Sequence, residues 1–271
     1  MAEFCDTHAH LDDPVFAPDL PQIIERARTA GVARIISVGT SLASSQNAIR
    51  LSEQYPNIFA VVGWHPSDAS EAPDDLRPDL QKLAAHPKCV AIGEIGLDYS
   101  QLPSKQPGGN PADDVPIKLK QAALFKQQLE VAAETGLNCV IHQREAFEDA
   151  VAILKPFHGK LRAVFHCFVE SPELARRILD AGHLVSFTGI VTFKNGKNVR
   201  ETLKSIPLGR FMIETDCPYL APTPYRGKRC EPAFLIETAR AIAELKGCSL
   251  DELARAANTA ANEFFIKLRR S

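Results

Sequence analysis

Short apolar runs alternate along the chain with longer segments in which apolar residues recur every three or four positions. The short runs are typical of buried strands, and the longer period is typical of amphipathic helices. The runs predict strands at residues 4–9, 33–38, 58–63, 89–93, 138–141, 161–165, 184–187 and 211–213. The periodic segments predict helices at residues 19–30, 73–85, 117–135, 145–157, 171–182, 231–246 and 249–268, a helix ending at 55 that Ser41 or Ser44 caps, and a loop with a short helix at 194–205.

Eight strands alternating with helices predict an α/β fold of the (β/α)₈ TIM-barrel type, as one domain over residues 1–271. An open doubly wound sheet is the alternative, but the first strand is not followed by the glycine-rich turn of a nucleotide site. Residues 100–116 contain four prolines and the pair Gly108-Gly109. This stretch predicts a loop that lies over another part of the molecule.

The overall composition gives few hints of a partner. The 271 residues are 45% hydrophobic and carry a net charge of −2, so there is no global attraction to nucleic acid. The sequence contains no apolar run of about eighteen residues, which predicts a soluble, cytoplasmic protein without a membrane partner. The seven cysteines are an odd number without regular spacing and fit reduced thiols. The oligomeric state is not predicted.

The segment Asp6-Thr7-His8-Ala9-His10 contains the first candidate for metal chemistry. Successive side chains of a strand point to opposite faces, so His8 and His10 project to the same side. Two neutral imidazoles on one face can bind one divalent ion. An isolated His-x-His is equally consistent with ordinary surface or core histidines.

Further polar residues follow the ends of other predicted strands. In a TIM barrel, the carboxyl ends of all eight strands meet at one mouth, where the chemistry takes place. The residues expected at this mouth are His8, His10, His65, Glu94, His142, His166 and Asp216. A purely structural barrel would place Val, Ile or Leu in most of these positions. The set predicts a site for one or two hydrolytic metal ions.

Five motifs in order along the whole chain resemble the TatD-type metal-dependent deoxyribonucleases of the amidohydrolase superfamily. They are Asp6-Thr7-His8-Ala9-His10-Leu11-Asp12, Gly93-Glu94-Ile95-Gly96-Leu97-Asp98-Tyr99, Ile141-His142-Gln143-Arg144-Glu145-Ala146, Phe165-His166-Cys167-Phe168 and Glu214-Thr215-Asp216-Cys217-Pro218-Tyr219-Leu220. The resemblance implies a metal-dependent hydrolase that cleaves DNA phosphodiester bonds, from a 3′ end, through a metal-activated water.

The resemblance also implies a role for each residue at the mouth. His8 and His10 would bind a first divalent ion, and His142 and His166 a second. Glu94 would bridge the two ions, and Asp216 would bind the first ion and act as general base. Mixed imidazole and carboxylate ligands accept Zn, Mn, Co or Fe, and Mg less well. The residue-level alternatives are that Glu94 is a plain salt-bridge partner and that Asp216 caps the turn before Pro218.

Substrate contacts are expected from His65, Tyr99, Arg144 and Arg229. Arginine suits bidentate contact with phosphate, and Trp64 or Tyr99 could stack on a terminal base. His65 is equally consistent with a structural role. The loops after the seventh and eighth predicted strands carry further cations, namely Lys194, Lys197, Arg226 and Lys228.

Departures from the family pattern concern substrate fit more than metal binding. Cys167-Phe168-Val169-Glu170 replaces a small serine-glycine pair, Cys230 replaces an asparagine and Asn138 replaces a proline. One alternative function is therefore a related metallohydrolase that cleaves another ester or amide, in a small molecule or in aminoacyl-tRNA. A second is a non-enzymatic binding protein that kept the fold.

Overall fold

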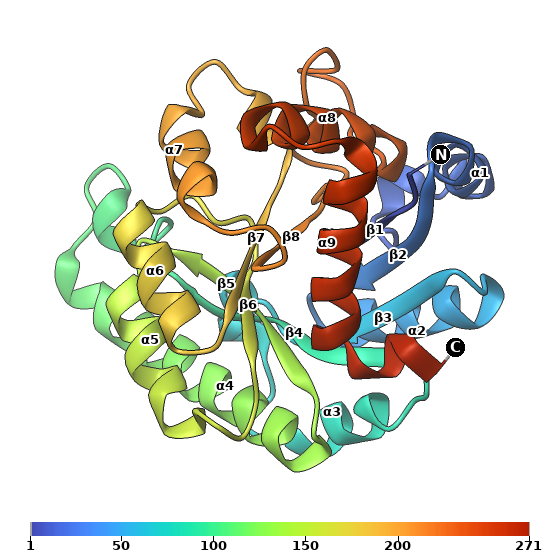
Figure 1. Cartoon of the computed structure of the whole chain (residues 1–271). Helices are drawn as coiled ribbons and strands as arrows, with labels where there is room; N and C mark the ends of the chain where they lie inside the picture. The colour runs from blue at the N-terminus through green and yellow to red at the C-terminus, as the bar shows by residue number, and fades with distance from the viewer. Residues whose placement is uncertain (1, 271) are drawn as a thin grey trace.

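The computed structural model of the chain describes residues 2–270, in which eight parallel strands form one sheet in the order β1 to β8 (Figure 1). The strands are β1 (Phe4–Ala9), β2 (Val32–Val38), β3 (Ile58–Val62), β4 (Cys89–Asp98), β5 (Asn138–Arg144), β6 (Ala163–Phe165), β7 (Leu184–Phe187) and β8 (Phe211–Ile213). The helices are α1 (Leu20–Ala30), α2 (Leu42–Gln54), α3 (Arg77–Ala84), α4 (Asp114–Thr135), α5 (Phe147–Leu154), α6 (Pro172–Asp180), α7 (Lys197–Ser205), α8 (Leu235–Lys246) and α9 (Leu250–Phe264). The helices surround the strands, and the predicted (β/α)₈ barrel is confirmed.

The barrel closes between its last and first strands at the carboxyl end. The Asp216 amide donates to the His8 carbonyl at 2.9 Å, and the His10 amide donates to the Cys217 carbonyl at 2.8 Å. These bonds bring the segment after β8 against the end of β1. The first and last of the five motifs therefore lie side by side, although His10 and Asp216 are 206 residues apart in sequence.

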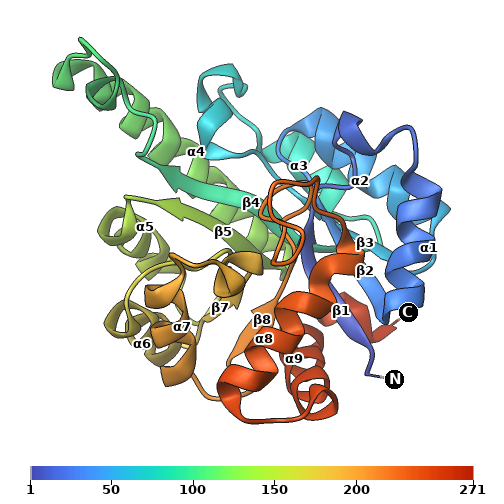
Figure 2. The same ribbon diagram turned by 90° about the horizontal axis from the view of Figure 1, so that it is seen from above.

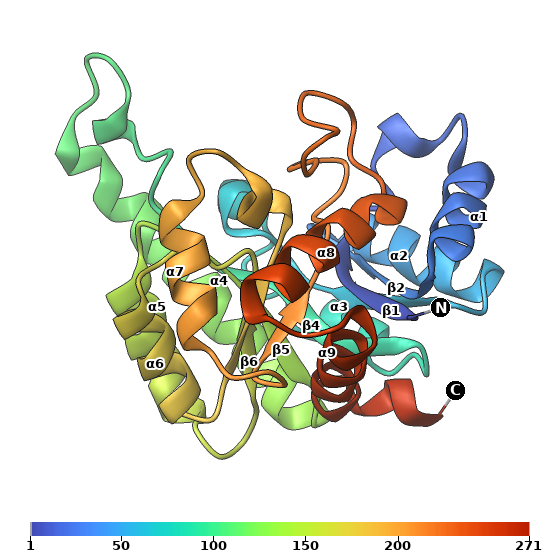
Figure 3. The same cartoon turned by 45° about the horizontal axis from the view of Figure 1, so that its top comes forward.

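The opposite, amino end of the barrel is closed by the end of α9. Phe264 and Phe265 pack in one cluster with residues of the strands, among them Phe59 and Met212. Asn138 at the start of β5 donates to the Phe264 carbonyl at 2.6 Å, which gives this departure from the family pattern a structural role. Figure 3 shows α9 below the barrel and the loops after β1 and β8 above it. We call Phe264 and Phe265, with the strand residues of the same cluster, the apolar plug. Because it fills the amino end, the carboxyl end of the barrel is the open face.

Several predicted boundaries shift in the structure. β4 continues from 93 to 98 and β5 from 141 to 144, so Glu94 and His142 lie within strands and not at their ends. The two extensions pair with each other, from Gly96 opposite His142 to Asp98 opposite Arg144. α4 begins three residues early, since Pro116 is tolerated in a first turn. The predicted helix 73–85 begins at Arg77, after a 3₁₀ helix at Pro66–Glu71.

The stretch 100–116 forms an arm with two 3₁₀ turns, Pro103–Lys105 and Pro111–Asp113. Figure 2 shows this arm projecting beyond α4. Residues 106–113 are exposed and project away from the barrel (Figure 2), so the prediction that the stretch covers another part of the molecule is wrong for them, whereas Lys105 pairs with Glu145 at 2.9 Å. Such a polar, proline-rich segment has little apolar surface with which to pack.

In the part of the chain that the structure describes, no helix combines the length and the apolar character needed to cross a membrane.

His183, just before β7, makes the fold sensitive to acid. Its side chain is 3% exposed, and its Nδ1 accepts from the Ala163 amide at 3.2 Å, which requires the nitrogen to be unprotonated. Burial, with His158 and Arg162 nearby, lowers the pKa of His183 from 6.5 to about 4. Because the folded-state pKa lies below the unfolded one, the neutral ring stabilises the fold above pH 6.5, and this stability is lost as the pH falls toward 4.

We predict that His183→Asn loses less stability in acid than the wild type, because an amide oxygen can accept the Ala163 bond at any pH. Between pH 7.5 and 4, the wild type should lose about 3 kcal/mol more of its unfolding free energy than the variant. Urea unfolding of both proteins at the two pH values measures the difference. Equal losses would contradict the prediction.

Candidate metal centre

The open end of the barrel holds a cavity of about 420 Å³. Its lining comes mainly from the segments that follow the strands and is strongly polar. The lining residues are His10, Asp12, Asp13, Pro14, Thr40, Ser44, His65, Asp68, Glu94, His142, Arg144, His166, Asp216 and Tyr219. The structure thus brings together the residues that the strand ends predicted, with His8 buried beneath them.

His8 and His10 point to the same side of β1, as the alternation of a strand requires. Their Nε2 atoms lie 3.3 Å apart. His10 Nδ1 lies 3.1 Å from the Val38 carbonyl oxygen, which can only accept, so this nitrogen carries a proton. In the neutral ring, Nε2 then presents its lone pair to His8, an arrangement that a shared cation stabilises.

Glu94 lies at the centre of the cluster and is 3% exposed. Its Oε2 is 3.3 Å from His8 Nε2 and 3.7 Å from His10 Nε2. Its Oε1 is 2.8 Å from His142 Nδ1 and 2.7 Å from His166 Nε2. Each oxygen therefore faces a different pair of imidazoles.

Asp216 completes the side of the cluster nearest β1. Its Oδ1 lies 3.4 Å from His10 Nε2 and 3.7 Å from His8 Nε2. The residue follows β8 with a positive φ of 59°. The hydrogen bond from the Asp216 backbone amide to the His8 carbonyl holds the residue in this conformation, and the carboxylate therefore points toward His8 and His10.

His65 is closer to the cluster than its position in the sequence suggests. Its Nε2 is 3.4 Å from Glu94 Oε1, the same oxygen that faces His142 and His166. His65 Nδ1 accepts from the Ser67 amide at 3.2 Å, which directs the ring toward the cavity. The structure therefore places a fifth imidazole at the cluster.

Two buried carboxylates behind the cluster were missed from the sequence. Asp98 Oδ2 lies 2.9 Å from His142 Nε2, and Glu214 Oε1 accepts from the Cys167 amide at 2.7 Å and lies 3.6 Å from His166 Nδ1. Asp98 is four residues after Glu94, and Glu214 two before Asp216. The two-residue period of a strand could have found Asp98, which lies in β4 with Glu94, but not Glu214, which follows the end of β8. Asp98 orients the His142 ring and selects its tautomer. Glu214 is held by the Cys167 amide, and His166 Nδ1 has no hydrogen-bond partner among the described residues.

The charges in the cluster follow from burial and close contact. Burial alone would raise the pKa of Glu94, but the charges of His166, His65 and His8 and the hydrogen bond from His142 hold it well below its usual value. Burial likewise opposes ionisation of Asp216, and the hydrogen bond with His10 lowers its pKa. Both carboxylates are therefore ionised at neutral pH and available as ligands.

The donor atoms fit a divalent metal ion. In three groups of residues, each residue offers one donor atom and the three donor atoms lie within 4.8 Å of one another. The groups are His8-Glu94-His166, His8-His10-Asp216 and His65-Glu94-His142. Imidazole nitrogen with carboxylate oxygen is the ligand chemistry of hydrolytic Zn, Mn, Co and Fe sites. His8 Nδ1 is buried without a hydrogen-bond partner, so its ring is held by the cluster and not by a second-side bond.

Two of the four predicted substrate residues line the cavity, Arg144 and His65. Tyr99 does not, because its hydroxyl donates to Asp149 at 2.9 Å and Lys118 covers its ring. Arg229 does not either, because it pairs with Asp19 at 2.7 Å. For Tyr99 and Arg229, the expectation of a place at the mouth is wrong.

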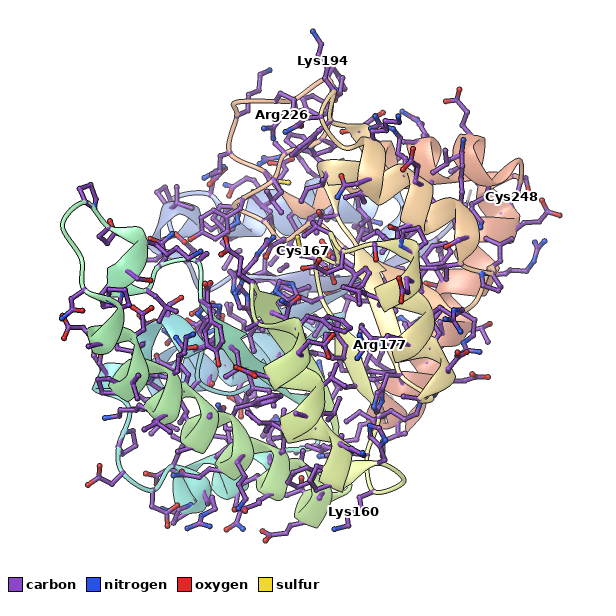
Figure 4. The ribbon with its side chains drawn as sticks, turned by 90° about the vertical axis from the view of Figure 1, so that its left-hand side faces the viewer. Lys160, Cys167, Arg177, Lys194, Arg226 and Cys248 are labelled. Carbon is purple, nitrogen blue, oxygen red and sulfur yellow. The ribbon has the colours of Figure 1, made fainter. Side chains whose placement is uncertain are left out.

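The other cations of the β7 and β8 loops also lie outside the described lining of the cavity. Figure 4 shows Lys194 and Arg226 at the outer edge of the molecule, away from Cys167 at the mouth. The Arg226 guanidinium packs on the Phe193 ring at 3.6 Å and donates to the Ala221 carbonyl. Arg226 therefore helps to hold one of these loops to the other.

Comparison with known proteins agrees with this arrangement. The family model of TatD related DNases matches residues 5–266. The chain is 41% identical over 261 residues to the uncharacterized metal-dependent hydrolase YabD of Bacillus subtilis, covering 96% of this chain and 98% of that protein. It is 37% identical over 264 residues to the 3'-5' ssDNA/RNA exonuclease TatD of Erwinia tasmaniensis, covering 95% and 96%.

Among solved structures, the TatD homologue YjjV of Escherichia coli K12 superposes with a TM-score of 0.88 at 27% identity, over 98% of both chains. The match of the family model extends over nearly the whole chain, and the relatives are covered almost from end to end. The chain belongs to the family of TatD related DNases.

Proposed function

We propose that this protein is a metal-dependent nuclease that hydrolyses phosphodiester bonds at the 3′ end of single-stranded nucleic acid, DNA foremost. The observation that carries the proposal is the position of Glu94, whose two oxygens face two different sets of imidazoles. The family and the exonuclease name of the Erwinia relative support the choice of a phosphodiester.

The same geometry supports two divalent ions. One would be held by His8, His10, Asp216 and Glu94 Oε2, and the other by His142, His166 and Glu94 Oε1. Bound there, such ions lower the pKa of a water molecule and neutralise the charge that develops on the phosphate. His65 Nε2, 3.4 Å from the same Oε1, is positioned to complete the second set or to contact substrate.

Asp216 is the proposed general base. The carboxylate is ionised, lines the cavity and belongs to the first ligand set. It would orient the attacking water and accept its proton as the oxygen bonds to phosphorus. Glu94 would hold the two ligand sets at the separation that this attack requires.

Arg144 is the proposed phosphate contact. It lines the cavity, and its Nη2 lies 3.6 Å from Cys167 Sγ, a weak acceptor that leaves its other donors available to an oxyanion. The guanidinium would hold a non-bridging oxygen of the scissile phosphate. We further propose a cytoplasmic site of action, which seven unpaired thiols support.

A second candidate is a hydrolase of an uncharged ester, such as a small-molecule or aminoacyl ester. The specific observation in its favour is the acidic rim, since Asp12, Asp13 and Asp68 line the cavity together with the single guanidinium of Arg144. These carboxylates disfavour a polyanion and do not affect a neutral ester.

The proposal is tested with purified protein, Mn²⁺, a 5′-labelled single-stranded DNA and a panel of small carboxylic esters. We expect a ladder of products shortened one nucleotide at a time, which EDTA abolishes. Turnover of the esters without shortening of the DNA would favour the second candidate.

We predict that Asp216→Asn and His142→Ala fold normally but lose most turnover. Removal of a base or a ligand should lower kcat on DNA by about 10²- to 10⁴-fold. Steady-state kinetics measure the loss, and circular dichroism monitors the fold. Asp180→Asn, a carboxylate on α6 whose side chain is 67% exposed, is the matched control and should behave as the wild type. Near-normal rates in either site variant would contradict the roles assigned to these residues.

We predict that Asp98→Asn weakens metal binding while most of the local structure persists. The asparagine oxygen can still accept from Ser100, but its amide would donate to His142 Nε2 and leave the proton on Nδ1, the atom that faces Glu94. The affinity for Mn²⁺ should fall by about 10- to 100-fold, as for other residues that orient a ligand imidazole. Isothermal titration of the metal-free proteins measures it. An unchanged affinity would rule out this orienting role.

A further inference from the structure

Tyr219 is an aromatic side chain at the mouth for which the reaction outlined above has no use. It lines the cavity, and the residue is 56% exposed. Its ring centroid lies 6.2 Å from that of His10, at an angle of 67°. One edge of the ring thus approaches the first ligand set, and much of its surface faces solvent.

The turn that carries Tyr219 is held by several hydrogen bonds. The Tyr219 amide donates to the Asp216 carbonyl at 3.0 Å, and the Pro218 carbonyl accepts from the Cys230 amide at 3.0 Å. Cys217, between Asp216 and Pro218, is fully buried. The backbone beneath the ring is therefore anchored to the barrel. A ligand that packs on the ring would immobilise little further backbone, so the entropic cost of binding is small.

The other aromatic side chains near the mouth already have partners. Tyr99 bonds to Asp149, and Trp64 Nε1 donates to the Asp68 carbonyl at 2.9 Å. Tyr225, on the same loop as Tyr219, stacks on Phe234 with ring centroids 3.9 Å apart. Histidines apart, Tyr219 is the aromatic residue in the described lining of the cavity.

We propose that the Tyr219 ring is the stacking platform for an unpaired nucleobase next to the scissile phosphate. The inference rests on the proposed nuclease function and adds to it a subsite for the base. Every base offers a flat π-face, so this contact is tolerant of sequence. It requires a base that is not paired and stacked within a duplex, which explains on physical grounds a preference for single-stranded ends.

The test compares two single-stranded DNA substrates with the Mn²⁺-loaded enzyme. One is an ordinary oligonucleotide, and in the other the two nucleotides at each end are replaced by abasic tetrahydrofuran residues. The readout is the ratio of the KM for the abasic substrate to the KM for the ordinary one. For the wild type we expect a ratio of about 5 to 100, the range that stacking on one aromatic residue supplies.

In Tyr219→Ala the ratio should fall to about 1, because the ring that distinguishes the substrates is missing. Tyr219→Phe keeps the ring and should keep the ratio of the wild type, as should Trp64→Ala. Thermal unfolding of the variants verifies the fold, which the exposed position of Tyr219 should leave intact.

The possible failures are distinguishable. If the wild type cleaves neither oligonucleotide, the proposed function fails and this inference with it. If both are cleaved and Tyr219→Ala keeps the ratio of the wild type, or only Trp64→Ala loses it, the nuclease function stands and the stacking role of Tyr219 is overturned.

Discussion

A buried, ionised carboxylate is the constraint on which the rest of this structure depends. Glu94 is 3% exposed, and such a charge is tolerated in the interior only when it is closely paired. Its partners come from β1, β5 and the segment after β6, so the barrel must close with all of these strands in register. Gly96 makes this possible, because a Cβ there would lie 2.0 Å from the His142 carbonyl oxygen and φ is +140°. A side chain at 96 would therefore push β4 away from the histidine that it must reach.

The two ends of the barrel divide stability and chemistry between them. At the amino end, the close of α9 supplies Phe264 and Phe265 to an apolar cluster inside the strands. Burial of such aromatic side chains stabilises the fold without any polar requirement. At the carboxyl end, the interior is filled by imidazoles and carboxylates, whose desolvation opposes folding. The apolar plug thus provides the stability that a polar mouth does not.

The sequence predicted much of this arrangement, and what it missed has a physical explanation. The order of strands and helices follows from local periodicity, and a parallel barrel necessarily brings strand ends together, so the six proposed ligands could be found without coordinates. Tyr99 and Arg229 were misjudged because their partners, Asp149 and Asp19, lie 50 and 210 residues away in sequence. Asp98 shares β4 with Glu94, so the strand period could have revealed it, whereas Glu214 follows the end of β8, where no strand alternation relates it to Asp216. Of the described strands, only β4 and β5 continue beyond their predicted ends, where they pair with each other.

The charge of the mouth links the metal centre to the choice of substrate. Five carboxylates line the cavity, Asp12, Asp13, Asp68, Glu94 and Asp216, against one guanidinium. These carboxylates repel a phosphodiester that approaches the open mouth. Divalent ions at the proposed ligand sets would reverse that field at the centre and leave the rim acidic. Attraction is then confined to a small region, which favours one phosphate at the end of a strand over a backbone lying across the mouth. On this argument, the carboxylates proposed as metal ligands would also limit how much of a polyanion can enter.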